Sequence, residues 1–229
     1  MKARNVVLLI LAIIIADQAL KFYIKLNFYA GDEHRIIGNW FKLHFVENEG
    51  MAYGWKFGAS FGKIALTLFR LVAVIWGSFL LKDFINKKYS TGFIICAALI
   101  YAGALGNLLD SMFYGLIFEE SKNTLYGVAN IAHLVPWGKG YANFLHGKVV
   151  DMLYFPIIEN AHYPSWVPII GGDEFTFFSF VFNIADASIS TGVIALLIFQ
   201  NKFLKHETQI VEPISLTTQA TEESKEKIN

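Results

Sequence analysis

Two aspartates in strongly apolar surroundings are the residues of this chain best suited to chemistry. Asp151 ends the run GKVVD, and Asp186 ends the run FNIAD. An ionised carboxylate is costly at membrane depth, so one that is kept there indicates a function. Two carboxylates held close together share a proton, so that one activates water as a base while the other protonates the leaving group. The pair predicts hydrolysis by an aspartyl dyad.

Other hydrolytic chemistries find little support in the sequence. A serine nucleophile needs a histidine base, and no HExxH run is present to bind zinc. The single cysteine, Cys96, lies in an apolar stretch without histidine, so we expect it to have a packing role. Water is then the nucleophile, and we expect neither a metal nor a cofactor. The six histidines all lie outside the apolar stretches: His34, His44, His133, His146, His162 and His206.

The composition indicates an integral membrane protein. Hydrophobic residues make up 55% of the chain and aromatic residues 16%, and the mean hydropathy is +0.44. A helix needs about 20 apolar residues to cross a bilayer. The first apolar stretch is not a cleavable signal peptide, because Asp17 and Lys21 stand where small residues should precede a cleavage site. We predict spans at about 5–25, 64–81, 92–113 and 177–203.

The cations flanking these stretches predict the orientation. If there are four spans, all the clusters fall on one side, which the positive-inside rule makes cytoplasmic. Both termini are then cytoplasmic, and residues 26–63 and 114–176 are extracytoplasmic. The net charge is zero without a basic block, which argues against nucleic acid as a partner. The clusters are Lys2 and Arg4; Lys82, Lys87 and Lys88; and Lys202 and Lys205.

The extracytoplasmic segments carry structure of their own. Residues 36–55 alternate apolar with polar side chains and end in glycines, which predicts one or two short strands followed by a turn. Residues 114–176 are rich in Trp and Tyr, as expected of a loop lying along the membrane surface. We predict an all-α membrane protein: a four-helix bundle with a small extracytoplasmic β-rich segment and an interfacial loop. It forms one domain, 1–205, and 206–229 form a disordered cytoplasmic tail.

Helical spacing gathers the polar residues of the spans into one layer. Asn107 and Asp110 are three residues apart on the third span and share a face, as Asn183 and Asp186 would on the fourth. Both pairs are expected two to three turns from the outer end of their helices, and Asp17 reaches a similar depth on the first. The sequence therefore predicts a polar site in the outer half of the bilayer.

Five ordered motifs resemble the signature of bacterial lipoprotein signal peptidase, also called signal peptidase II. Each alone is weak, but the five occur in the right order on four spans of the right orientation. The resemblance covers the chain from the first span to the fourth. The motifs are Asp17-Gln18-x-x-Lys21, Asn48-x-Gly50-x-Ala52-x-Gly54, Gly103-Ala104-x-Gly106-Asn107-x-x-Asp110, Val149-Val150-Asp151 and Phe182-Asn183-x-Ala185-Asp186.

The resemblance implies an aspartyl endopeptidase of the bacterial cytoplasmic (inner) membrane, with its active site toward the extracytoplasmic side. Its partners would be membrane lipid and a prolipoprotein carrying a diacylglyceryl cysteine, which it would cut just before that cysteine. Asp151 and Asp186 match the catalytic pair. The supporting or substrate-binding residues would be Asp17, Lys21, Asn48, Gly50, Gly54, Asn107, Asp110 and Asn183.

Individual roles follow for some of the supporting residues. Asn183, Asn107 and Asp110 would orient a carboxylate or the substrate, and Asp17 would hold the first helix to the site. We expect Asn48 in a turn that closes over the scissile bond, and Lys21 as a cation snorkelling to the interface. These are the expectations that the structure has to meet.

Two features depart from the family pattern. The family usually has Arg after the aspartate matched by Asp110, whereas this chain has Ser111. A cation that would grip substrate carbonyls is therefore missing, which leaves Lys148 or another external cation as a replacement. The segment 116–146 is also longer than expected.

Other classes of protein remain open from the residues alone. A proton-coupled transporter also needs carboxylates in its spans, but along a path through the bilayer, and none is evident on the cytoplasmic halves. A presenilin-type protease would carry a GxGD sequence, which is absent. In a structural assembly factor the polar residues would only hold helices together, and no dyad would be needed.

Overall fold

The computed structural model describes residues 1–49, 59–122, 129–169 and 171–205, and the following account refers to these residues. Four helices are long and apolar enough to cross a membrane. They match the predicted spans in number, and their length and composition suit a multi-pass membrane protein. The helices are α1 (Ala3–Asn27), α2 (Ala59–Asn86), α3 (Thr91–Ile117) and α4 (Ile184–Lys205).

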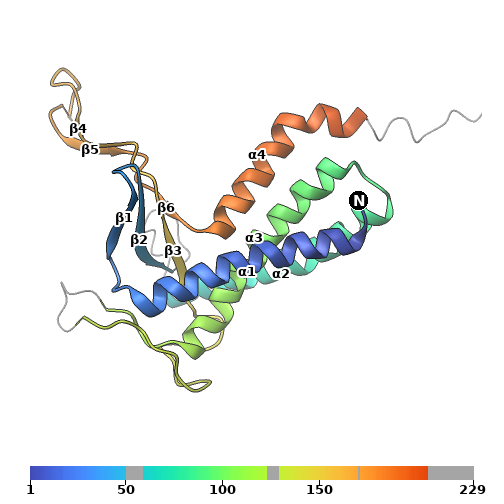
Figure 1. Cartoon of the computed structure of the whole chain (residues 1–229), viewed down its shortest axis with the longest axis horizontal. Helices are drawn as coiled ribbons and strands as arrows, with labels where there is room; N and C mark the ends of the chain where they lie inside the picture. The colour runs from blue at the N-terminus through green and yellow to red at the C-terminus, as the bar shows by residue number, and fades with distance from the viewer. Residues whose placement is uncertain (50–58, 123–128, 170, 206–229) are drawn as a thin grey trace, which may run out of the picture.

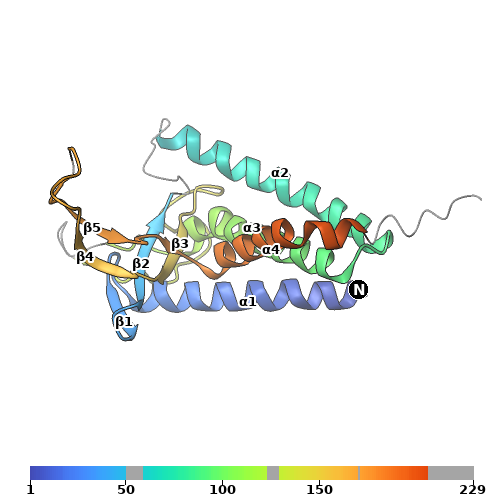
Figure 2. The same ribbon diagram turned by 90° about the horizontal axis from the view of Figure 1, so that it is seen from above.

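Helix α3 is the centre of the bundle. It packs against α1, α2 and α4, and Figure 2 shows α1 and α2 on opposite sides of it. In its most apolar stretch 44% of residues are buried within the protein, against 17% in each of the other three helices. The outer faces of those helices expose large apolar side chains, as a surrounding of lipid requires. Examples are Leu8, Ile15, Phe69, Trp76, Phe79, Leu197 and Ile198.

A four-stranded antiparallel sheet lies at the end of the bundle opposite the N-terminus (Figure 1). Its order is β1-β2-β3-β6, so β3 lies between a hairpin from the segment that joins α1 to α2 and a short strand just before α4. A separate hairpin pairs β4 with β5. The strands are β1 (Glu33–Ile37), β2 (Phe41–Asn48), β3 (Val149–Tyr154), β4 (Ile158–His162), β5 (Glu174–Phe177) and β6 (Val181–Phe182).

Of the one or two strands predicted in 36–55, β2 is confirmed, whereas β1 lies mostly before that range and the strands of the second segment were missed. Val149, Val150, Asp151 and Met152 of β3 are all buried. A strand covered on both faces loses the alternation that marks a strand in a sequence. The expectation of a loop along the membrane surface over 114–176 therefore missed β3, β4 and most of β5, and β6 lies just beyond that range. The four-stranded sheet joins the segment between α1 and α2 to the segment between α3 and α4.

The fourth span was predicted too long at its outer end. Residues 174–177 and 181–182 form β5 and β6, and α4 begins at Ile184. Asn183 precedes the helix, and its Oδ1 accepts the backbone N–H of Asp186 at 2.8 Å, as an N-capping side chain does. Asp186 therefore lies in the first turn of α4, not two to three turns inside it.

The long segment after α3 folds back along the end of that helix. Phe118 bridges to Leu134, and the N–H of Gly147 donates to the carbonyl of Ser111 at 2.9 Å. A side chain at Gly147 would place Cβ 2.1 Å from the carbonyl oxygen of Asp110, so only glycine fits this approach. The segment thereby attaches the start of β3 to α3 beside Asp110.

The orientation of the bundle is open to direct measurement. In a Cys96→Ala background, Asn86→Cys at the end of α2 should resist a membrane-impermeant thiol reagent in intact cells, because the positive-inside rule predicts that the cation-rich side is cytoplasmic. Asp173→Cys, beside the β4-β5 hairpin, should react. Labelling of the Asn86→Cys variant from outside would overturn the orientation.

Candidate active site

Asp151 is held by two amide side chains in the middle of the sheet. Its Oδ1 accepts a hydrogen bond from Asn183 Nδ2 at 2.7 Å, and its Oδ2 accepts one from Asn48 Nδ2 at 3.1 Å. The residue is 3% exposed. Strand β3 fixes its backbone, and the two amides fix the plane of its carboxyl group.

Asp186 faces the same cluster from the first turn of α4. Its Oδ1 accepts from Asn107 Nδ2 at 2.7 Å, and the N-terminus of a helix favours a negative charge. Asn183 touches both aspartates, since its Nδ2 binds Asp151 and its Oδ1 caps Asp186. The structure therefore brings together the two carboxylates singled out from the sequence.

The surroundings raise the pKa of Asp151 to about 7. Burial is the largest cause, and the nearby charge of Asp186 acts in the same direction. Hydrogen bonds from Asn48 and Asn183 and the charge of Lys21 oppose the shift. At neutral pH the carboxyl group of Asp151 is therefore poised to carry a proton beside Asp186.

This raised pKa predicts how stability depends on pH. The folded protein holds the proton of Asp151 up to about pH 7, whereas the unfolded chain releases it near 3.8. This contribution to the free energy of unfolding is fully present below pH 3.8 and is lost as pH rises through 7. We expect the melting temperature in detergent to fall less steeply over this range in Asp151→Asn. Asp83→Asn should keep the wild-type slope, and an unchanged slope in Asp151→Asn would contradict the shift.

Lys21 is the cation at the centre of the site, and the prediction that it snorkels is wrong. Its side chain is fully buried, and Nζ lies 2.8 Å from Asp17 Oδ2 and 2.6 Å from Asp110 Oδ2. Attraction to two carboxylates offsets the free-energy cost of removing the ammonium group from water, so Lys21 can be buried. Nζ also donates to Asn107 Oδ1 at 2.9 Å. This contact turns the amide nitrogen of Asn107 toward Asp186.

Asp17 joins α1 to the start of α4. Its Oδ1 accepts the backbone N–H of Ala185 at 2.9 Å, which places it where its predicted role requires. Gly103 of α3 allows the close approach of α4, since a Cβ there would lie 2.2 Å from the carbonyl oxygen of Ala185. Gln18, to which no role was given, donates to Asp110 Oδ1 at 2.8 Å and accepts from the hydroxyl of Tyr114 at 3.1 Å.

The motif that begins at Asn48 is only partly described. Asn48 is the last residue of β2, paired with Val149, so it is not in the turn where the sequence placed it. Gly50 and Gly54 lie outside the described residues. Within the described ranges, no group of three or more His, Cys, Asp or Glu side chains is arranged to hold a metal ion.

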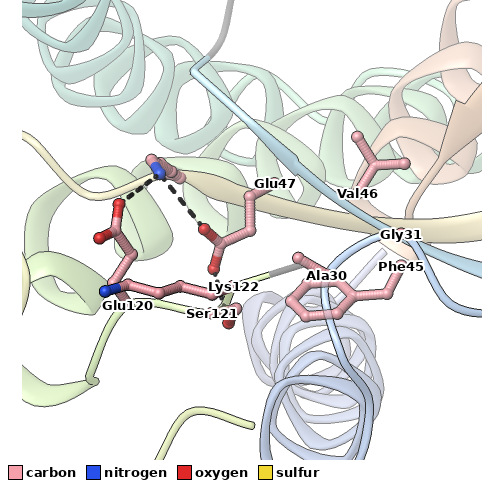
Figure 3. A pocket seen from close by; sticks show the side chains of 9 residues that line it. Ala30, Gly31, Phe45, Val46, Glu47, Glu120, Ser121 and Lys122 are labelled. Carbon is pink, nitrogen blue, oxygen red and sulfur yellow. Dashed lines mark hydrogen bonds and ion pairs between the residues drawn. The ribbon is translucent and has the colours of Figure 1, made fainter. Parts of the chain in front are cut away.

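Lys148 lies at a separate polar cavity of about 520 Å³ beside the sheet (Figure 3). Its Nζ is 3.4 Å from Glu47 Oε2 and 3.6 Å from Glu120 Oε1. Glu47 also pairs with the buried Lys25. Lys148 is thus paired with these glutamates. No contact among the described residues places it at Ser111, where the family's arginine would be replaced.

Arg70 of α2 is the cation beside Ser111, and sequence reasoning missed it. Its Nη1 donates to Ser111 Oγ at 3.1 Å, and the carboxylates of Asp110, Asp151 and Asp186 lie near enough to interact with its charge. A signal was available, because an arginine inside an apolar span is rare and functional by default.

Comparison with known proteins places the chain in a family. Residues 9–202 match the family described as signal peptidase (SPase) II. A lipoprotein signal peptidase of Porphyromonas gingivalis is 45% identical over 198 residues, covering 86% of this chain and 83% of the relative. One of Amoebophilus asiaticus is 32% identical over 211 residues, covering 91% and 82%.

Solved structures show the same fold. A bacterial membrane enzyme aligns with a TM-score of 0.51 at 23% identity, covering 87% of this chain and 89% of its own. At that identity the likeness concerns the fold alone. The sequence matches are decisive for the family. The chain belongs to the signal peptidase II family, the lipoprotein signal peptidases, which cleave the signal peptides of lipoproteins.

Proposed function

We propose that this protein is an intramembrane aspartyl endopeptidase with Asp151 and Asp186 as its catalytic dyad. Its substrate is a prolipoprotein carrying a diacylglyceryl cysteine, cleaved just before that cysteine. The main support for the proposal is that the side chain of Asn183 hydrogen-bonds both to the side chain of Asp151 and to the backbone of Asp186. One side chain thereby sets the relative position of both carboxylates.

The two aspartates differ in ways that suit different parts of one reaction. Asp186 is half-buried at a helix N-terminus, where a carboxylate is favoured and can activate water. Asp151 is buried with its pKa raised to about 7, so it carries the shared proton at neutral pH. The water attacks the scissile carbonyl carbon and passes its proton to Asp186, and Asp151 hydrogen-bonds to the carbonyl oxygen. Collapse of the tetrahedral intermediate breaks the peptide C–N bond, and the amine takes a proton from the dyad.

The position of the site suits a substrate anchored in lipid. The dyad lies where the helices meet the sheet, at the end of the bundle opposite the N-terminus (Figure 1). With the termini in the cytoplasm, this end faces the extracytoplasmic side of the bacterial cytoplasmic (inner) membrane. A diacylglyceryl group in the outer leaflet then holds the neighbouring peptide bond at the depth of the dyad.

The test is cleavage by the purified protein in lipid. A prolipoprotein bearing a diacylglyceryl cysteine should be cut on the N-terminal side of that cysteine, as read by mass spectrometry. The matched control is the same polypeptide without the lipid, which should be cut far more slowly. Cleavage at another bond, or no cleavage of the lipidated substrate by protein that is folded and inserted, would contradict the proposal.

A further inference from the structure

Arg70 is a cation within an apolar helix whose neighbours face lipid. Leu68, Phe69 and Val72 are exposed on the same stretch of α2, while Arg70 is half-buried. An arginine in a span is costly and turns toward the protein interior. A charged side chain in this position is expected to have a binding partner or a functional role.

The contacts of Arg70 with the described residues use few of its donors. A guanidinium group has five N–H donors, and among the described residues Arg70 makes one hydrogen bond, to Ser111 Oγ. Ser111 Oγ in turn donates to the carbonyl of Asn107 at 3.0 Å. No described carboxylate pairs with Arg70 directly, in contrast to Lys21, whose donors are used by Asp17 and Asp110.

The charges that face Arg70 come from three elements. They are Asp186 of α4, Asp110 of α3 and Asp151 of β3. Asp110 and Asp17 both pair with Lys21 of α1 and share its single positive charge. Among the described residues no cation is in direct contact with the dyad, so Arg70 is the nearby positive charge that is not already paired with a carboxylate.

We propose that Arg70 is the substrate-binding cation of the active site. Its free N–H groups bind a backbone carbonyl oxygen of the peptide beside the scissile bond, and its charge stabilises the ionised carboxylate of the dyad. The inference rests on the proposed function. It also accounts for Ser111, whose short side chain leaves room for a guanidinium that arrives from α2 rather than from α3.

The experiment compares four variants with the wild type on a lipidated prolipoprotein in nanodiscs. Arg70→Gln should lower kcat/KM about 100-fold, the loss typical of one removed charge-stabilising donor. Its residual activity should peak at higher pH, because removing a cation favours the protonated carboxylates. Arg70→Lys should retain more activity, and Ser111→Arg added to Arg70→Gln should recover at least about tenfold. Lys82→Gln, an exposed cation on the same helix, should change nothing.

The outcomes separate this inference from the proposed function. No cleavage by the wild type would defeat the proposed function. With an active wild type, the inference is overturned if Arg70→Gln cleaves within threefold of it. It is equally overturned if activity falls without a change in the pH profile and neither Arg70→Lys nor the Ser111→Arg double variant recovers any. If Arg70→Gln fails to insert into the membrane, kcat/KM and the pH profile of Arg70→Lys and of the double variant test the inference instead.

Discussion

Replacing Asp186 by Asn is expected to abolish cleavage, with kcat falling roughly 10³-fold or more. An amide cannot act as the base that activates water, and it cannot share a proton with Asp151. Asp151→Asn should be equally inactive. Because the two groups act as a unit, the double variant should be little worse than either single one. Single-turnover cleavage of a lipidated prolipoprotein measures all three.

The structure makes Asp186→Asn the cleaner of the two variants. Its Oδ1 accepts one hydrogen bond, from Asn107, and an asparagine oxygen can accept the same bond. Both carboxylate oxygens of Asp151 accept hydrogen bonds, from Asn48 and Asn183. In Asp151→Asn, the new NH2 group would face the NH2 group of one of these asparagines, and that hydrogen bond would be lost. The control is Asp83→Asn, at a surface ion pair with Lys87, which should leave kcat unchanged. An Asp186→Asn variant that folds and keeps more than a few per cent of the activity would refute the aspartyl mechanism.

Replacing Lys21 by Met is expected to destabilise the protein by about 3–5 kcal/mol, the usual consequence of removing one partner of a buried ion pair. Asp17 and Asp110 would be left buried without their shared cation. Asn107 would also lose the donor to its Oδ1 that orients it toward Asp186. Activity should therefore fall together with stability. Unfolding by titration with a denaturing detergent provides the measurement.

A matched control distinguishes burial from the mere presence of an ion pair. Lys87 pairs with Asp83 at 2.8 Å, but its side chain is 62% exposed. Lys87→Met should cost no more than about 1 kcal/mol, as exposed pairs do. Adding Asp17→Asn and Asp110→Asn to Lys21→Met should recover part of the stability, because the stranded charges are removed. A Lys21→Met variant as stable as Lys87→Met would show that the site does not depend on this cation.

The sequence alone was sufficient for the number of spans and for the family, and it singled out the two carboxylates. Apolar stretches of sufficient length have few alternatives to membrane helices. The ends of α1 and α3 were therefore predicted to within four residues and those of α2 to within five. Asp151 and Asp186 were conspicuous because a charge in apolar sequence is costly. The motifs that surround them carried the resemblance to signal peptidase II, which the comparisons confirm.

Only the tertiary structure decided how these residues meet. Periodicity did not reveal β3, because a strand buried on both faces shows no alternation. It also extended the fourth span back to residue 177, through β6 and Asn183. The burial of Lys21 and the arrival of Arg70 at Ser111 depend on contacts between residues far apart in the chain. Whether a cation reaches lipid headgroups or a buried carboxylate is decided by which helix faces lie against it, and the pairing of those faces is a property of the packed bundle.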